Sequence, residues 1–148
     1  MQTALFIEQI LNGLQLGVML FLMAAGLTLI FGVMGLINLA HGSLYMVGAF
    51  ACASVAAATG SFWLGLAASL AAAAAAGAIV EILVIRRLYD RDHLDQVLAT
   101  FALILIFSEG TRWLFGSFPL YLDIPPLLQG TVPLPGGSRY QLYRLAII

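Results

Sequence analysis

A short polar patch inside a long apolar stretch is the part of the sequence best suited to chemistry. It contains Asn38, His41 and Ser43, with Gly42 between the last two. A histidine side chain can donate, accept or exchange a proton near neutral pH, and amide and hydroxyl groups form hydrogen bonds of their own. Among apolar side chains, such groups are either paired in a structural role or line a substrate path or its gate. We therefore take Asn38, His41, Gly42 and Ser43 as candidate substrate-path residues.

The backbone at this patch has two interpretations. Asn38 and His41 share a face if one helix continues through them, whereas Gly42 and Ser43 indicate a break, with Ser43 as the N-cap of a second helix. Broken helices expose backbone groups to substrate in transporters, and a tight cytoplasmic turn is the plainer alternative. An enzyme is not expected, because no carboxylate lies near Ser43 and His41 to orient a nucleophile and a base.

The segment that holds the patch carries no charged side chain. Residues 9–80 contain no Asp, Glu, Lys or Arg, and the chain of 148 residues is 62% hydrophobic and 9% charged. A soluble domain must wet its surface every few residues, whereas a membrane helix needs about 20 apolar residues and tolerates few charges. The sequence therefore predicts a multi-pass integral membrane protein.

The apolar pattern predicts an all-α transmembrane bundle that forms a single domain over residues 1–148. An external loop, with a short hairpin as one form it could take, is expected over residues 116–141, which hold all five prolines. Residues 142–148 match the start of a fifth span, and we expect the chain to be cut there. The four complete spans are expected at about residues 10–39, 43–59, 62–85 and 94–115.

The distribution of arginines predicts the orientation of the chain. Arg86, Arg87 and Arg91 form its one dense basic cluster, and no basic residue precedes them. Basic loops stay on the cytoplasmic side, and nearby aspartates count little. We therefore expect a cytoplasmic loop at these arginines and, three crossings earlier, an N-terminus outside.

Small residues recur along one face of the first span. They let another helix approach closely, so that dispersion replaces the hydrophobic drive that lipid does not provide. The residues expected to serve helix packing are Gly13, Gly17, Ala24, Thr28, Gly32 and Gly35.

Ionisable residues near the span ends have structural interpretations. Glu81 is expected to snorkel to the inner interface with Arg86 nearby. Glu109 and Arg112 are three apart on the fourth span and can pair, and Asp92 or Asp95 can cap its start.

Composition also excludes several functions. The chain has six arginines and no lysine, which excludes a P-loop and a Schiff-base site, so any ATP must be bound by another chain and no cofactor is expected here. The single cysteine, Cys52, cannot form an intrachain disulfide, and two distant histidines give no metal site. The net charge of −1 gives no nucleic-acid footprint.

Two segments resemble one known family. Gly26 to Ala49, with Asn38-Leu-Ala-His-Gly-Ser43 at its centre, is similar to the signature of the permease subunits of branched-chain amino-acid ABC transporters, the LivH type. Glu81 to Gly116 is similar to the arginine-rich inner loop of that family and the helix that follows it. Family members are longer, so the resemblance implies the N-terminal half of a permease.

The resemblance implies an ATP-driven importer of branched-chain or related amino acids in the inner membrane. It implies a second permease subunit, two ATP-binding subunits and an extracytoplasmic solute-binding protein as partners, besides the lipid bilayer. The match at Leu98-Ala-Thr-Phe101 adds Thr100 as a candidate for the substrate path. A permease for urea, amides or other small solutes, and a short non-transporting scaffold or assembly subunit, stay open as alternatives.

Overall fold

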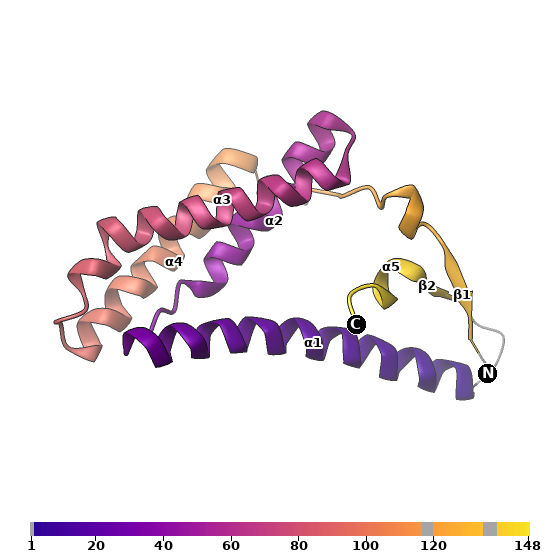
Figure 1. Cartoon of the computed structure of the whole chain (residues 1–148), viewed down its shortest axis with the longest axis horizontal. Coiled ribbons are helices and arrows are strands. Elements are labelled where there is room, and N and C mark those ends of the chain that lie inside the picture. Colours follow the sequence, from indigo (N-terminus) through magenta and orange to yellow (C-terminus); the bar gives the residue numbers. More distant parts are fainter. Residues whose placement is uncertain (1, 117–119, 135–138) are drawn as a thin grey trace. The chain divides into compact units, whose positions relative to one another are not determined.

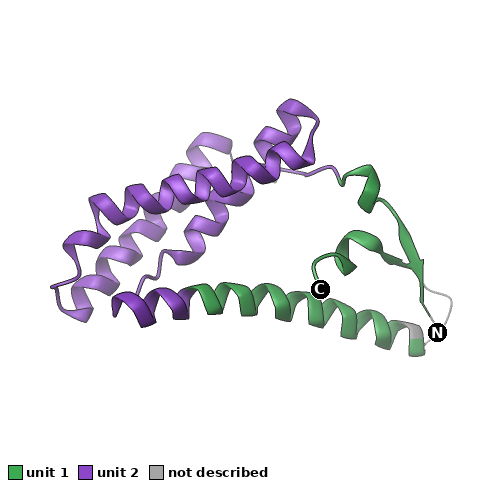
Figure 2. Ribbon diagram, viewed as in Figure 1, with its two compact units in different colours: residues 1–26, 124–148 green, residues 27–123 purple. Residues whose placement is uncertain are grey.

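The computed structural model describes residues 2–116, 120–134 and 139–148. Contacts within the chain divide it into two compact units (Figure 2): unit 1 comprises residues 1–26 and 124–148, and unit 2 comprises residues 27–123. Lipid, rather than protein, covers much of a membrane domain, so such a domain need not form one compact unit through its own contacts. The single membrane domain expected over residues 1–148 stays a prediction.

The first helix, α1, runs from Gln2 to Met34 (Figure 1). It ends at Gly35, which has a φ of +64° and whose N–H donates to the Phe31 carbonyl at 2.8 Å. A left-handed residue at this position is the usual helix stop, and glycine adopts it without a Cβ penalty. The helix therefore begins before residue 10 and ends before residue 39, so that the chain breaks ahead of the polar patch at Asn38.

The second helix, α2, covers His41–Thr59 and stops at Gly60, again with a positive φ, of 68°. It begins earlier than predicted, and Ala40 occupies the N-cap. The prediction that Ser43 caps this helix is wrong, because Ser43 lies inside the first turn and its backbone N–H donates to Ala40 O.

Two further long helices complete unit 2. Helix α3, Phe62–Leu83, is capped by Ser61, whose Oγ accepts from Leu64 N at 3.5 Å, and leads into a 3₁₀ turn, η1, at Ile85–Arg87. Helix α4 covers His93–Phe115; Asp92 is at its N-cap position but forms no side-chain cap bond. Four helices of the described chain are long and apolar enough to cross a membrane, which confirms the predicted multi-pass all-α bundle.

Close packing between α2 and α3 depends on two glycines. A Cβ added at Gly65 would lie 2.7 Å from the Cys52 carbonyl oxygen and 3.0 Å from the Ala56 Cβ. At Gly48 it would lie 3.5 Å from the Ser69 carbonyl oxygen, an ordinary contact. The backbones of α2 and α3 therefore approach most closely at Gly65, where only glycine fits without a shift.

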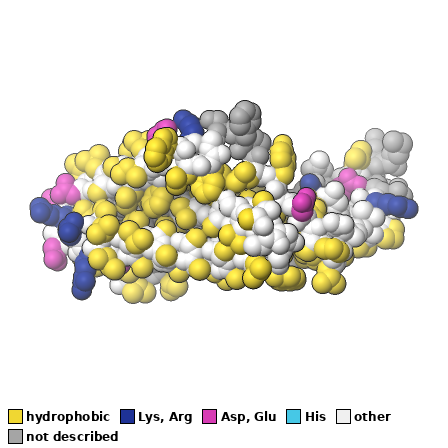
Figure 3. All heavy atoms as spheres, turned by 90° about the horizontal axis from the view of Figure 1, so that it is seen from above, with side chains coloured by type: hydrophobic (Ala, Val, Ile, Leu, Met, Phe, Trp, Pro, Cys, Tyr) yellow, Lys and Arg dark blue, Asp and Glu magenta, His cyan; other side chains and the backbone are white. Residues whose placement is uncertain are grey.

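The outward faces of these helices are apolar. In each of the four spans at most 17% of the most apolar window is buried inside the protein. In Figure 3, apolar side chains cover much of unit 2 on the visible face, and charged side chains gather at the end where η1 and the start of α4 lie. This distribution is that of a bundle whose surroundings are hydrocarbon.

After α4 the described chain contains one hairpin and two short helical turns. A 3₁₀ turn, η2, at Pro126–Leu128 precedes β1 (Thr131–Pro133) and β2 (Arg139–Gln141), which pair antiparallel with Val132 opposite Tyr140. A hairpin within the loop is thus confirmed, while Pro119 and Pro135 lie outside the described residues. At the expected start of a fifth span the structure has α5, Leu142–Leu145.

Candidate functional site

The break between α1 and α2 is partly buried in protein, although Gly35 and Leu39 within it are exposed. Leu36 is fully buried and Ala40 is 1% exposed, and both belong to an apolar cluster with Val80, Ile85 and Leu103. Four partly buried side chains pack against this cluster: Val84, Leu88, Ile104 and Phe107. Irregular backbone within a membrane domain is tolerated where protein or a polar cavity surrounds it. The break is therefore a built feature that α3, η1 and α4 hold in place.

Asn38 closes the turn that starts α2. Its Oδ1 accepts a hydrogen bond from Ala40 N at 3.0 Å, and its backbone oxygen accepts from His41 N at 3.3 Å. The side chain is 4% exposed. Asparagine commonly mimics a backbone turn in this way, so the amide oxygen of Asn38 is already used in positioning His41.

His41 is the first residue of α2 and is partly buried. Its Nδ1 is buried and has no hydrogen-bond partner within the described part of the chain. A buried polar atom without a partner costs free energy, about 1–3 kcal/mol. Of the patch, this ring nitrogen is therefore the atom suited to bind a group from outside the chain.

The remaining candidates differ in environment. Gly42 is exposed, and a Cβ added there would meet nothing within 4 Å, whereas Ser43 is 7% exposed. Thr100 is fully buried, and its Oγ1 donates to the Gln96 carbonyl at 2.8 Å. It lies three residues before Leu103, which packs in the same cluster as Leu36 and Ala40. The role of these residues in a substrate path stays a prediction.

Gln96 is a structural residue that was not among those expected from the sequence. It is 3% exposed, and its Nε2 donates to the carbonyls of Leu88 and Arg91, both at 3.1 Å. Its Oε1 lies 3.3 Å from His93 Nδ1. The buried amide of Gln96 thus closes the loop between η1 and α4. In the sequence, the spacing of four residues between Gln96 and Thr100 places both on one helix face, and this spacing could have indicated that Gln96 is buried.

Glu81 contacts Tyr89 rather than Arg86. The Tyr89 hydroxyl donates to Glu81 Oε1 at 2.5 Å, and among the described residues Glu81 forms no ion pair with Arg86. The hydrogen bond to Glu81 is the main cause that raises the pKa of Tyr89 above its usual value, and burial adds to it. The expected pairing of Glu109 with Arg112 is confirmed, at 3.1 Å on an exposed face.

The arginine loop lies at the surface of unit 2. Arg86, Arg87 and Arg91 are all exposed. Arg87 Nη1 donates to the Leu83 carbonyl at 2.7 Å, which satisfies one of the free carbonyls at the end of α3. The loop therefore presents three positive charges at one end of the helices, as the orientation prediction requires.

The small residues expected to serve packing on α1 are a different case. A Cβ added at Gly13, Gly17, Gly32 or Gly35 would meet nothing within 4 Å in the described structure. The packing role predicted for these glycines, and with them for Ala24 and Thr28, stays a prediction. The glycine that the structure places at a close helix contact is Gly65 of α3.

Comparison with known proteins adds a family match. A family model described as the permease component of branched-chain amino acid transport systems matches residues 9–119. The matched range contains the break, the arginine loop and α4. No solved structure matches the chain.

Individual relatives match over shorter segments. The high-affinity branched-chain amino acid transport system permease protein LivH of Escherichia coli is 39% identical over 75 residues, which are 51% of this chain and 24% of LivH. LivH of Salmonella typhimurium is 37% identical over 75 residues, which are again 51% of this chain and 24% of that protein. The permease protein BraD of Pseudomonas aeruginosa is 42% identical over 45 residues, 30% of this chain and 15% of BraD. The aligned segments thus span about a quarter or less of these relatives.

Proposed function

Because the chain belongs to the family of branched-chain amino acid transport permeases, we propose that it is a transmembrane subunit of an ATP-driven importer of branched-chain or related amino acids. The observation that carries the proposal is the family match, which covers residues 9–119. The chain has no lysine for a P-loop, so ATP is bound by separate subunits and this chain needs no cofactor.

The proposed assembly contains a second permease subunit, two ATP-binding subunits and an extracytoplasmic solute-binding protein, and it lies in the inner membrane. The four apolar helices provide the membrane part. The exposed arginines of the loop before α4 support an orientation with that loop in the cytoplasm and the N-terminus outside.

In this importer the break between α1 and α2 serves as an inner gate. Met34, the last residue of α1, lies beside Tyr89 of the arginine loop, which supports a position near the cytoplasmic end. Asn38 holds the turn through its amide oxygen, and His41 offers a buried Nδ1 without a partner within the described chain. We assign to His41 the hydrogen bond with passing solute and to Asn38 the positioning of His41.

Thr100 has a supporting part in this gate. Its hydroxyl is engaged with the Gln96 carbonyl, on the same helix as Leu103, which packs against the break. We propose that Thr100 shapes the α4 side of the gate rather than binding solute directly. Gly42 and Ser43, which lie in the first turn of α2, are assigned to the same gate.

Leucine uptake into cells that express all partner subunits tests the proposal. His41→Leu is expected to abolish most uptake while the amount of protein in the membrane stays normal. Thr59→Leu is the matched control, because Thr59 is exposed on the same helix and the change also replaces a polar side chain by leucine. Unchanged uptake in His41→Leu would remove His41 from the path. Absence of uptake by the unchanged protein with every partner present would refute the importer and favour a scaffold.

A further inference from the structure

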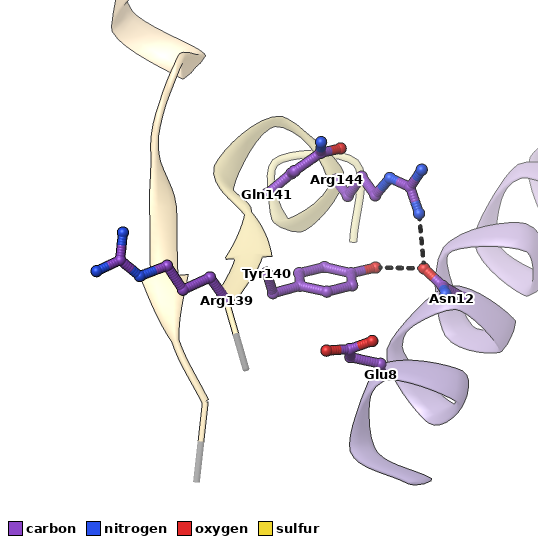
Figure 4. Close-up of a pocket in the computed structure, with 6 residues that line it drawn as sticks. All are labelled: Glu8, Asn12, Arg139, Tyr140, Gln141 and Arg144. Carbon is purple, nitrogen blue, oxygen red and sulfur yellow. Dashed lines mark hydrogen bonds between the residues drawn. The ribbon is translucent and has the colours of Figure 1, made fainter. Parts of the chain in front are cut away.

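Unit 1 contains a cavity of about 200 Å³ whose lining residues all carry a polar or charged group and include no aliphatic side chain (Figure 4). Two of its lining residues lie on α1, three on β2 and one on α5; they are Glu8, Asn12, Arg139, Tyr140, Gln141 and Arg144. Small-molecule sites usually combine apolar walls with a few polar groups. A lining without aliphatic side chains therefore suits the charged end of a small molecule better than its apolar part.

One side of the cavity holds a guanidinium in a fixed position. Arg144 Nη1 donates to Asn12 Oδ1 at 3.0 Å, and its Nε donates to the Tyr143 oxygen at 3.1 Å. The Tyr140 hydroxyl donates to the same Asn12 oxygen at 3.0 Å, and Tyr140 is only 4% exposed. The two hydrogen bonds of Arg144 within the described residues are donated by Nε and Nη1, and the Tyr140 hydroxyl is a further neighbour of its guanidinium. The side-chain entropy of this arginine is therefore largely lost before a ligand arrives.

The other side of the cavity holds a free carboxylate. Glu8 lies four residues before Asn12 on α1, so the two share a helix face with Cβ atoms about 5–6 Å apart. Within the described residues, the Glu8 carboxylate has neither an ion pair nor a hydrogen bond. Glu8 thus lies one helical turn before Asn12, the residue that accepts the hydrogen bond from Arg144, so the cavity contains one unpaired negative charge and one held positive charge.

Arg139 does not contribute its charge to this arrangement. In Figure 4 its guanidinium points away from Asn12 and Glu8, on the opposite side of β2 from the Tyr140 ring. Successive strand residues point to opposite faces, so Arg139 lines the cavity with its stem while Tyr140 reaches Asn12.

We propose that this cavity binds the zwitterionic end of a free α-amino acid. Glu8 accepts hydrogen bonds from the α-ammonium group, and Arg144 Nη2 donates to the α-carboxylate. Charge-assisted hydrogen bonds of this kind are roughly twice as strong as neutral ones. The proposal rests on the proposed transport function and names a further amino-acid site within it. The aliphatic side chain meets no aliphatic lining residue here, so this site distinguishes amino acids from other solutes but discriminates little among amino acids.

Direct binding of radiolabelled leucine to the full chain in lipid nanodiscs tests this site. Unlabelled alanine is expected to compete within about threefold of leucine, because both carry the same charged ends. Isoamylamine lacks the carboxylate and 4-methylpentanoate lacks the ammonium group. Each is expected to compete about tenfold or more less well, as the loss of one charged hydrogen-bonding group implies. Absence of leucine binding, or equal competition by either single-charge analogue, would overturn the proposal.

Variants then assign the two charges. Glu8→Gln is expected to weaken leucine binding about tenfold or more, and it breaks no hydrogen bond recorded within the described chain. Glu109→Gln is the matched control, since it removes the same charge from an exposed ion pair in unit 2 and should leave binding unchanged. Arg144→Lys keeps the charge without the planar fork and is expected to bind more weakly than the unchanged chain. Equal binding by Glu8→Gln and the unchanged chain would refute the site.

Uptake by the assembled importer separates failure of this site from failure of the proposed function. If leucine uptake occurs and Glu8→Gln raises the KM for both leucine and alanine, the site is supported. If uptake occurs and neither KM nor leucine binding changes in Glu8→Gln, the site is refuted while the importer stands. If no uptake occurs with all partners present, the importer is refuted, and leucine binding in nanodiscs together with its loss in Glu8→Gln then decides the site separately.

Discussion

The Tyr89 hydroxyl lies 3.5 Å from the sulfur of Met34, the last residue of α1. The same hydroxyl donates to Glu81 Oε1 at 2.5 Å. One side chain of the arginine loop therefore contacts both the end of α1 and the last part of α3. The break after Met34 and the arginine loop lie at the same end of unit 2, and this places Asn38 and His41 on the side where the positive charges gather.

This relationship predicts which loops a membrane-impermeant thiol reagent reaches. In a Cys52→Ala background, Asp90→Cys is expected to be labelled only when the cytoplasmic face is open, because the proposed orientation follows the rule that basic loops stay on the cytoplasmic side. Ser61→Cys, in the turn between α2 and α3, is expected to be labelled from outside. Labelling of intact cells and of inverted vesicles measures both. The reverse pattern would invert the proposed orientation and move the break to the outer face.

The contact between α2 and α3 predicts a large effect of a single methyl group. Gly65→Ala places a Cβ 2.7 Å from the Cys52 backbone oxygen, so the two helices must move apart. We expect a loss of about 1–3 kcal/mol in the free energy of unfolding, as for overpacked cores. Reversible unfolding in mixed micelles measures the change.

Gly110→Ala is the control for this prediction, because a Cβ there meets nothing within 4 Å and alanine favours the helix. It should leave the free energy of unfolding unchanged or raise it slightly. If Gly65→Ala and Gly110→Ala change the free energy of unfolding equally, the close approach of α3 to α2 at Gly65 does not contribute to stability.

The raised pKa of Tyr89 predicts a pH dependence in the alkaline range. In the unfolded chain Tyr89 has the ordinary tyrosine pKa of about 10, and in the folded chain its pKa is raised because the hydroxyl donates a hydrogen bond to Glu81. The hydrogen bond between Tyr89 and Glu81 therefore contributes fully to the stability of the folded chain below about pH 10. This contribution is lost as the pH rises through the raised pKa of Tyr89 in the folded chain. Spectrophotometric titration of the folded chain should show one tyrosine with a raised pKa that disappears in Tyr89→Phe.

Tyr121→Phe is the matched control for this titration, since Tyr121 is 86% exposed and lacks a hydrogen bond within the described residues. The raised step should persist in that variant. If Tyr89→Phe leaves the alkaline titration unchanged, the hydrogen bond between Tyr89 and Glu81 does not form in the protein.

The buried amide of Gln96 predicts how the arginine loop is held. Gln96→Leu leaves the carbonyls of Leu88 and Arg91 without their side-chain donor, which costs about 1–3 kcal/mol. The loop should then open more often, and trypsin should cleave faster after Arg91. Gln9→Leu, at an exposed position of α1, is the control and should leave the cleavage rate unchanged. Equal cleavage rates in both variants would show that Gln96 does not close the loop.

Membrane insertion and helix number were determined by the sequence itself. A charge-free stretch over residues 9–80 is incompatible with a wetted surface, and each long apolar segment became a helix of sufficient length. Turn chemistry was equally local, because Gly60 and Ser61 stop one helix and start the next through their own backbone and hydroxyl groups. Hydropathy is a property of neighbouring residues, so the spans can be predicted without knowledge of the fold, whereas the start of α2 at Ala40 instead of Ser43 could not be predicted in this way.

Tertiary structure decided which of several similar residues form the close contacts between helices. Gly13, Gly17 and Gly65 look alike in an apolar sequence, yet only Gly65 faces another described backbone closely enough to exclude a methyl group. The partnership of Tyr140 with Asn12 joins residues 128 positions apart, and no local pattern in the sequence marks it. Such contacts depend on where distant segments meet in space, and that position results from the packing of all elements together rather than from the propensity of any one.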